Sequence, residues 1–129
     1  MVSSDVVELG GARVALDASG IVVVTHAPQS VLDVAIARRI LDSHRRFAAG
    51  RKLPVLVDAR GVRRADREAR ELVAGPAVAA HTSRVALLVG GTVSAVIGNF
   101  FLRVSRPVYP TRVFSDIEEA RAWLLAGAP

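Results

Sequence analysis

The chain of 129 residues is long enough for one domain around a single core, and its 51% apolar residues exclude a disordered protein. The absence of cysteine excludes disulfides, thiolate metal sites and a cysteine nucleophile. The net charge is +5, and the positive residues are arginines apart from Lys52. This charge affects solubility and does not by itself indicate binding of nucleic acid. We expect one domain over residues 1–129, with residues 1–10 loosely ordered, no secretory leader and a cytoplasmic location.

The N-terminal part of the chain has the pattern of a β-hairpin. Val6 and Val7 fit a short edge strand. Two apolar runs, residues 12–16 and 21–25, then flank a turn cluster of Asp, Ala, Ser and Gly at 17–20. The glycine of this cluster can take the positive φ that a tight turn needs.

A helix is predicted from Ser30, as its N-cap, to Gly50. Its apolar residues recur close to helical spacing. They are Val31, Val34, Ala37, Ile40, Leu41 and Phe47. Asp42 is expected to pair with Arg38 or Arg46, each one turn away.

The run from Leu53 to Asp58 predicts a strand at the centre of a sheet. Its apolar residues do not alternate with polar ones, which is typical of a strand covered on both faces. A helical segment follows at 65–74, and Gly75-Pro76 starts a further short helix through Ala80. A second buried strand is predicted at 85–89.

The stretch from Val85 to Leu102 carries no charge. Because Gly90-Gly91-Thr92 interrupts it, we interpret it as a strand and a helix and not as a membrane span. We expect Val96, Ile97, Phe100 and Val104 to face the sheet, with Val93 on the same side of the helix. A two-proline loop, a strand at 111–114 and a capping box at Ser115–Glu118 follow. The last helix is expected to bury Ile117, Ala120, Trp123 and Leu124.

A hairpin followed by strand–helix alternation predicts an α/β fold. We expect a mixed, mostly parallel sheet of about five strands, with an N-terminal hairpin and about four helices.

The central segment resembles the STAS or SpoIIAA-like family of anti-sigma-factor antagonists. Those proteins carry a strand ending in Asp, a Gly-Val pair, and a second Asp followed by Ser at a helix start. Val57-Asp58, Gly61-Val62 and Asp66 match this pattern in type and spacing. Arg67 occupies the position of the family's phosphorylated serine, so the resemblance does not extend to the kinase-controlled switch.

The C-terminal half is similar to uncharacterised bacterial STAS/Sec14-like single-domain proteins. The matching motifs are Asp66–Arg70, Ala74–Pro76, Ala86–Gly90, Ile97–Leu102, Pro110–Phe114 and Ala122–Leu124. This resemblance implies a fold and leaves the activity open.

The polar residues do not form a recognisable catalytic or metal-binding pattern. His26, His44 and His81 have no ligand spacing, and we place His44 among solvated helix charges. Asp58 either forms a binding group with neighbouring arginines or accepts hydrogen bonds within its own loop. A hydrolase or transferase built on Asp58 and His26 is a third reading, which requires the two side chains to meet. We expect no enzyme, no metal and no cofactor.

Two surfaces are candidates for binding. Arg63, Arg67 and Arg70 would share one helical stripe that could hold an acidic partner, or could be a solvated ion-pair face. The Gly90-Gly91-Thr92 turn could hold an anion at a helix N-terminus, or be an ordinary cap. The preferred interaction surface is the stretch from Asn99 to Leu102 together with the Pro107–Pro110 loop, which contains Tyr109. Phe100 is expected to face the sheet, and Phe101 and Leu102 to lie at the edge of the buried face, unless the loop covers them.

The sequence thus favours a non-enzymatic regulatory or protein-interaction domain that binds a protein partner or forms a homodimer. The alternative is a Sec14-like carrier or sensor of a small apolar or lipid-like ligand. We expect no nucleic acid and no membrane span. The predicted ligand- or partner-binding residues are Asp58, Arg67, Arg70, Asn99, Phe101, Leu102 and Tyr109.

Overall fold

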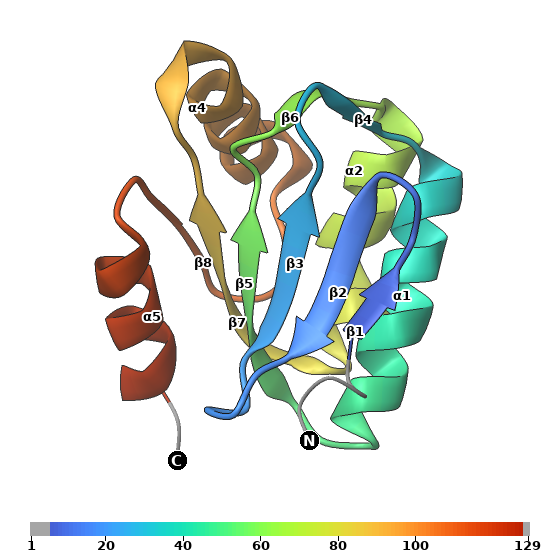
Figure 1. The fold of residues 1–129 in the computed structure, drawn as a ribbon, viewed down its shortest axis with the longest axis vertical. Coiled ribbons are helices and arrows are strands. Elements are labelled where there is room, and N and C mark those ends of the chain that lie inside the picture. Colours follow the sequence, from blue (N-terminus) through green and yellow to red (C-terminus); the bar gives the residue numbers. More distant parts are fainter. Residues whose placement is uncertain (1–5, 128–129) are drawn as a thin grey trace.

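The computed structural model describes residues 6–127, and its centre is a six-stranded sheet in the order β1-β2-β3-β5-β7-β8 (Figure 1). A separate two-stranded sheet pairs β4 with β6. The strands are β1 (Val6–Glu8), β2 (Ala12–Leu16), β3 (Val22–His26), β4 (Ser30–Leu32), β5 (Leu53–Asp58), β6 (Val62–Ala65), β7 (Thr82–Leu88) and β8 (Thr111–Phe114). The helices are α1 (Val34–Ala48), α2 (Arg67–Ala74), α3 (Pro76–Ala79), α4 (Gly91–Phe100), a π-helical turn (Phe101–Ser105) and α5 (Ile117–Ala126).

The predicted α/β class and the hairpin are confirmed. β1, β2 and β3 are antiparallel neighbours, and all later pairs in the large sheet are parallel. β5 lies between β3 and β7, with Val55 and Leu56 buried on opposite faces of the sheet. The segment that ends in Asp58 is therefore the interior strand that its unbroken apolar pattern predicts.

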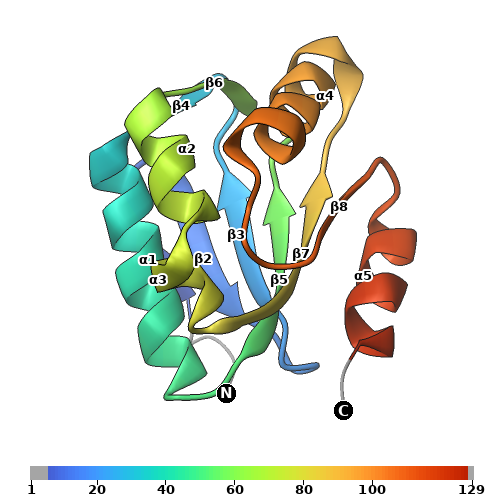
Figure 2. The same cartoon turned by 180° about the vertical axis from the view of Figure 1, so that it is seen from behind.

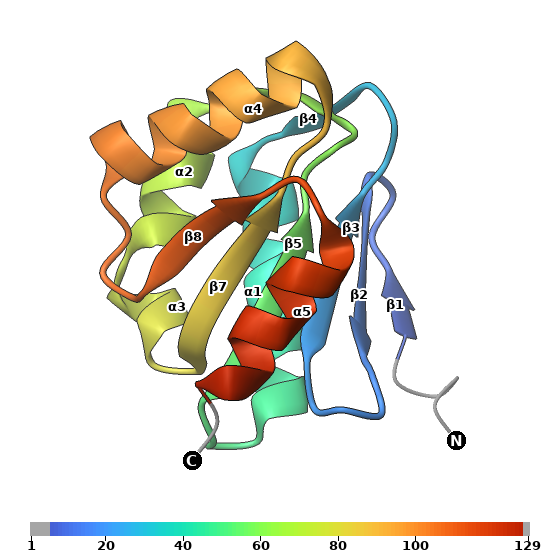
Figure 3. The same ribbon diagram turned by 90° about the vertical axis from the view of Figure 1, so that its left-hand side faces the viewer.

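Helices cover the two faces of the sheet unequally. α1, α2 and α3 lie over one face, and α5 lies alone on the other (Figures 2 and 3). The larger core cluster lies under the first group and includes Val14, Val24, Val55 and Leu87. α4 lies across the end of the sheet at which the parallel strands finish (Figure 1). Within residues 6–127 no helix is long and apolar enough to cross a bilayer.

The predicted start of the first long helix is wrong. Ser30 begins β4, which pairs in parallel with β6, and its N–H donates to the carbonyl oxygen of Gly61. The N-cap is Asp33, whose Oδ1 accepts from the Ile36 N–H at 2.9 Å. Because β6 takes up residues 62–65, the next helix also begins later than expected, at Arg67. Local spacing could not reveal this pairing between distant segments.

The predicted ion pair and capping box also need correction. Asp42 pairs with Arg45 at 3.0 Å, and not with Arg38 or Arg46. The N-cap of α5 is Asp116 and not Ser115. The Asp116 carboxylate accepts hydrogen bonds from the backbone N–H groups of Glu118 and Glu119.

The buried face of α5 is narrower than predicted. Ala120 and Leu124 are buried, and Trp123 is half-buried against Phe114 at a ring-centroid distance of 5.7 Å. Ile117 was expected to be buried, yet it is 41% exposed in the first turn.

Helix α4 is turned relative to the predicted orientation. Ser94, Gly98 and Phe101 point inward, whereas Val96 and Phe100 are exposed. Ser94 and Gly98 are small because α4 packs very close there: a Cβ on Gly98 would lie 3.0 Å from a methyl group of Val89. Ile97, which was predicted to face the sheet, is half-buried and does line the cavity beside the sheet. Val96, Phe100 and Val104 were also predicted to face the sheet, but they lie on the outer side.

Gly61 is a point of close backbone approach that we expect to control stability. A Cβ there would lie 2.7 Å from the carbonyl oxygen of His26 and closer still to that of Ala27. Gly61→Ala should therefore lower the free energy of unfolding by about 1–3 kcal/mol. Gly11→Ala is the matched control, because a Cβ at Gly11 meets nothing within 4 Å. Equal denaturant midpoints for the two variants would contradict this packing.

Candidate ligand-binding cavity

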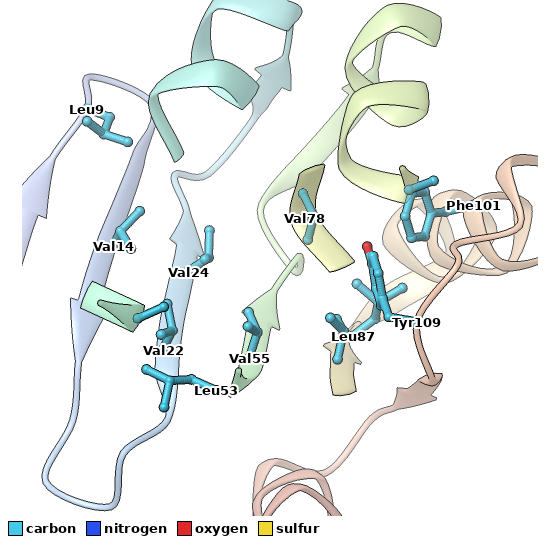
Figure 4. Close-up of a cluster of buried hydrophobic side chains, with 13 residues drawn as sticks. Leu9, Val14, Val22, Val24, Leu53, Val55, Val78, Leu87, Phe101 and Tyr109 are labelled. Atoms are coloured by element: carbon cyan, nitrogen blue, oxygen red, sulfur yellow. The ribbon is translucent and has the colours of Figure 1, made fainter. Parts of the chain in front are cut away.

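A cavity of about 120 Å³ lies between the sheet and helices α1, α2 and α4. Almost all of its wall is aliphatic or aromatic. The wall comprises Val24, His26, Leu32, Ala37, Ile40, Leu41, His44, Val55, Val57, Ala59, Val62, Ala65, Arg70, Val73, Val78, Val85, Leu87, Ile97, Gly98, Phe101 and Tyr109. It is continuous with the larger core cluster, part of which Figure 4 shows around Val55, Leu87, Phe101 and Tyr109.

The two aromatic side chains of the wall come from the chain segment that follows α4. Phe101 opens the π-helical turn and is buried. Tyr109 lies on the proline loop, and its hydroxyl donates to the carbonyl oxygen of Val73 at 2.6 Å. Burial raises the pKa of Tyr109 well above its usual value, so the phenol stays protonated. The predicted residues Phe101 and Tyr109 thus meet, but inside the domain and not on its surface.

His44 belongs to the cavity wall, so its placement among solvated charges is wrong. It is only 3% exposed, and its Nε2 lies 3.0 Å from the carbonyl oxygen of His81. Burial lowers the pKa of His44 below its usual value. The signal was present in the sequence, because Ala37, Ile40 and His44 recur at helical spacing on the buried side of α1.

His26 is the second histidine of the wall and ends β3. It is 7% exposed, and among residues 6–127 no hydrogen bond joins its ring to another group. Burial lowers the pKa of His26 to about 4, outweighing the nearby charge of Asp58, which acts to raise it. His26 is therefore a neutral imidazole at pH 7.

Asp58 does not join His26 in the cavity. Alternation along the strands places His26 with Val24 on the cavity face, whereas Asp58 lies with Leu56 on the α5 face. The Asp58 carboxylate accepts from the Arg60 backbone N–H at 3.2 Å and from its guanidinium at 2.9 and 2.8 Å. Burial would raise the pKa of Asp58, but the hydrogen bonds and charge of Arg60 outweigh it and lower the pKa. The local-loop interpretation of Asp58 fits this geometry.

The three arginines expected on one helical stripe do not share one. Arg63 lies on β6, where its Nε donates to the carbonyl oxygen of Gln29 at 3.3 Å. Arg67 is exposed and pairs with Glu71 at 3.0 Å along α2.

Arg70 is the member of the predicted stripe that reaches the cavity. Its Nε donates to the carbonyl oxygen of Ala65 at 3.1 Å, and its guanidinium lies 4.7 Å from the ring centroid of Phe100. It therefore links α2 to α4.

The exposed apolar surface lies on the outer side of α4 and differs from the predicted one. Val93, Val96, Phe100 and Val104 form this outer stripe, and each is at least 44% exposed. Asn99 lies beside the stripe in a shallow groove, with its amide bonded back to the Ala95 carbonyl oxygen. Of the residues predicted there, Phe101 is buried and Leu102 is half-buried.

A serine side chain from the first turn of α4 holds the backbone of the turn that precedes this helix. The hydroxyl of Ser94 accepts from the Gly90 N–H at 2.8 Å and donates to the Gly90 carbonyl oxygen at 2.7 Å. Within residues 6–127, no group of three or more His, Asp or Glu side chains is placed to hold a metal ion.

A family model for a domain of unknown function, DUF7793, matches residues 15–126. The chain belongs to the DUF7793 family. A search of the curated proteins found no match.

One solved structure shows that this DUF7793 domain has a SpoIIAA-like fold. It resembles an uncharacterised DUF3478-family protein with a SpoIIAA-like fold from Shewanella loihica PV-4, at 17% identity and a TM-score of 0.66. That match covers 92% of this chain and 97% of the other. A protein of unknown function from Arthrobacter sp. FB24 matches at 25% identity and a TM-score of 0.35, over 92% and 95% of the two chains. The first likeness confirms the fold expected from the sequence.

The buried histidines of the DUF7793 domain predict a loss of stability in mild acid. The unfolded chain, in which His26 has an ordinary pKa of 6.5, binds a proton more readily than the folded chain, in which the pKa is about 4. The free energy of unfolding should therefore fall from pH 7 to pH 4.5, by about 2 kcal/mol for His26 alone.

Urea unfolding of wild type and His26→Leu at the two pH values measures this contribution. His26→Leu should show a smaller pH dependence, with a remainder of the same sign from His44. An equally steep fall in both proteins would contradict the assignment.

Proposed function

We propose that this domain is a non-enzymatic binding domain that holds a compact apolar ligand in the cavity beneath α4. The observation that carries the proposal is the apolar wall around about 120 Å³ of space. In another protein, an engineered apolar cavity of about 150 Å³ stays dry and binds benzene. A ligand with the bulk of about one six-membered ring therefore suits this cavity as it stands.

The polar groups near the cavity support binding more than catalysis. The Tyr109 hydroxyl and His44 already have backbone partners, and the carboxylate of Asp58 lies on the opposite face of the sheet. A hydrolytic or transfer reaction needs a nucleophile and a base within reach of each other. The Sec14-like resemblance agrees with a carrier or sensor role.

Toluene is a suitable probe of the cavity. We expect saturable toluene binding by the wild type, seen as chemical-shift changes of the Val24, Val55 and Leu87 methyl groups. Val57→Phe fills the cavity from its wall, so it should abolish the binding and raise the free energy of unfolding by about 0.5–2 kcal/mol.

Val23→Phe is the matched control, because the neighbouring strand β3 directs Val23 to the other face of the sheet. It should leave toluene binding unchanged. Failure of wild type to bind toluene, or equal binding by Val57→Phe, would contradict the proposed function.

A second candidate function is self-association through the outer stripe of α4. The stripe is apolar along three turns, and charge lies only at its border, where Arg70 stacks on Phe100 and Arg103 lines the groove. Such exposed apolar surfaces often mark contacts between proteins. The homodimer predicted from the sequence would then form through Val96 and Phe100 in place of Phe101.

Light scattering after size exclusion tests the homodimer. Wild type should elute as a dimer, and Val93→Glu with Val96→Glu should be a monomer, because each change places a charge on the outer stripe. Leu125→Glu is the control, since Leu125 is 43% exposed on α5 and lies away from α4. A monomeric wild type rules out this candidate and leaves the cavity proposal standing.

A further inference from the structure

The cavity wall contains four side chains with polar atoms, and three of them are engaged. Tyr109 donates to the Val73 carbonyl oxygen, and His44 contacts that of His81. Arg70 donates to a backbone carbonyl and stacks on Phe100. His26 is the fourth, and among residues 6–127 its ring has no hydrogen-bond partner.

Polar side chains inside folded proteins are stable when their polar atoms find partners. His26 is 7% exposed and lines the otherwise apolar cavity. Its ring nitrogens are not sealed off, because the fully buried side-chain atoms without a partner among residues 6–127 are Ser30 Oγ, His81 Nδ1, Thr82 Oγ1 and Ser105 Oγ. The ring can therefore reach a molecule in the cavity space that it borders. A ligand in that space is the group best placed to supply the missing hydrogen bond.

The neutral state of His26 indicates which head group it would bind. The low pKa of His26 keeps its ring neutral at pH 7, so one nitrogen donates a hydrogen bond and the other accepts one. The Asp58 carboxylate is paired with Arg60 and lies on the other face of the sheet, so it does not bond the ligand. A neutral hydroxyl or carbonyl satisfies the imidazole without bringing a second ion into the apolar cavity.

We propose that His26 anchors, by a hydrogen bond, a neutral ligand that carries one hydroxyl or carbonyl group on a compact apolar body. This inference rests on the proposed function, since it assigns the chemical class of the molecule held in the same cavity. The aliphatic and aromatic wall holds the apolar body, and His26 selects the polar group.

Phenol and toluene form a matched pair of probes, since they have nearly the same shape and differ in the hydroxyl group. Calorimetric titration of both into wild type and His26→Leu gives four dissociation constants. Differences in ligand hydration cancel when the phenol-to-toluene ratio is compared between the proteins. His26→Leu should weaken phenol relative to toluene by about three- to tenfold, and His26→Gln should retain part of the phenol preference.

The outcomes separate the two proposals. If neither probe binds wild type, the proposed function fails and this inference fails with it. If both bind and the ratio is unchanged in His26→Leu, the anchor is overturned while the cavity function stands. Ring nitrogen shifts of His26 in wild type test the anchor without any substitution: phenol should move them and toluene should not. Equal shifts with the two probes would also overturn it.

Discussion

The close contact between α4 and the end of the sheet determines both candidate binding sites of this domain, the cavity and the outer stripe of α4. Gly98 allows the contact, because a Cβ there would press on Val89. Ser94 supports it by using its buried hydroxyl to hold the turn at Gly90. The same contact directs Phe101 into the cavity wall and leaves Val96 and Phe100 on the outside. Closure of the cavity and exposure of the outer stripe are thus two results of one helix placement.

The sheet separates the ionic groups from the cavity. Asp58 and Arg60 neutralise each other on the α5 face, where the carboxylate is partly buried. The cavity face carries neutral groups apart from one cation, Arg70, which is held by a backbone carbonyl and an aromatic ring. An apolar molecule can therefore enter without stripping water from a free charge, which would cost more than its burial returns.

The sequence predicted what depends on short-range pattern. The unbroken run before Asp58 identified the interior strand, and the turn at 17–20 identified the hairpin. The predictions were wrong where contacts between distant segments determine the structure. The pairing of β4 with β6 delays the start of α1, and the close packing at Gly98 turns α4 so that Val96 and Phe100 face outward. The cavity is a volume between elements, so no local motif could show it. His44 and the two aspartate caps, Asp33 and Asp116, do have local signals in the sequence: the helical spacing of His44 with Ala37, and an acid directly before each helix.

The start of α2 differs chemically from the SpoIIAA-like pattern that its sequence resembles. Asp66 precedes the helix, but its carboxylate pairs with Arg64 at 3.2 Å and makes no cap bond to the helix. Arg67 follows it and extends along the surface to Glu71. Arg67 cannot be phosphorylated as the serine of that pattern is, because its side chain ends in a guanidinium and not in a hydroxyl. Three residues further along α2, Arg70 lines the cavity and stacks on Phe100, so the α2 side chain that touches the candidate site belongs to the cavity wall and not to the helix start.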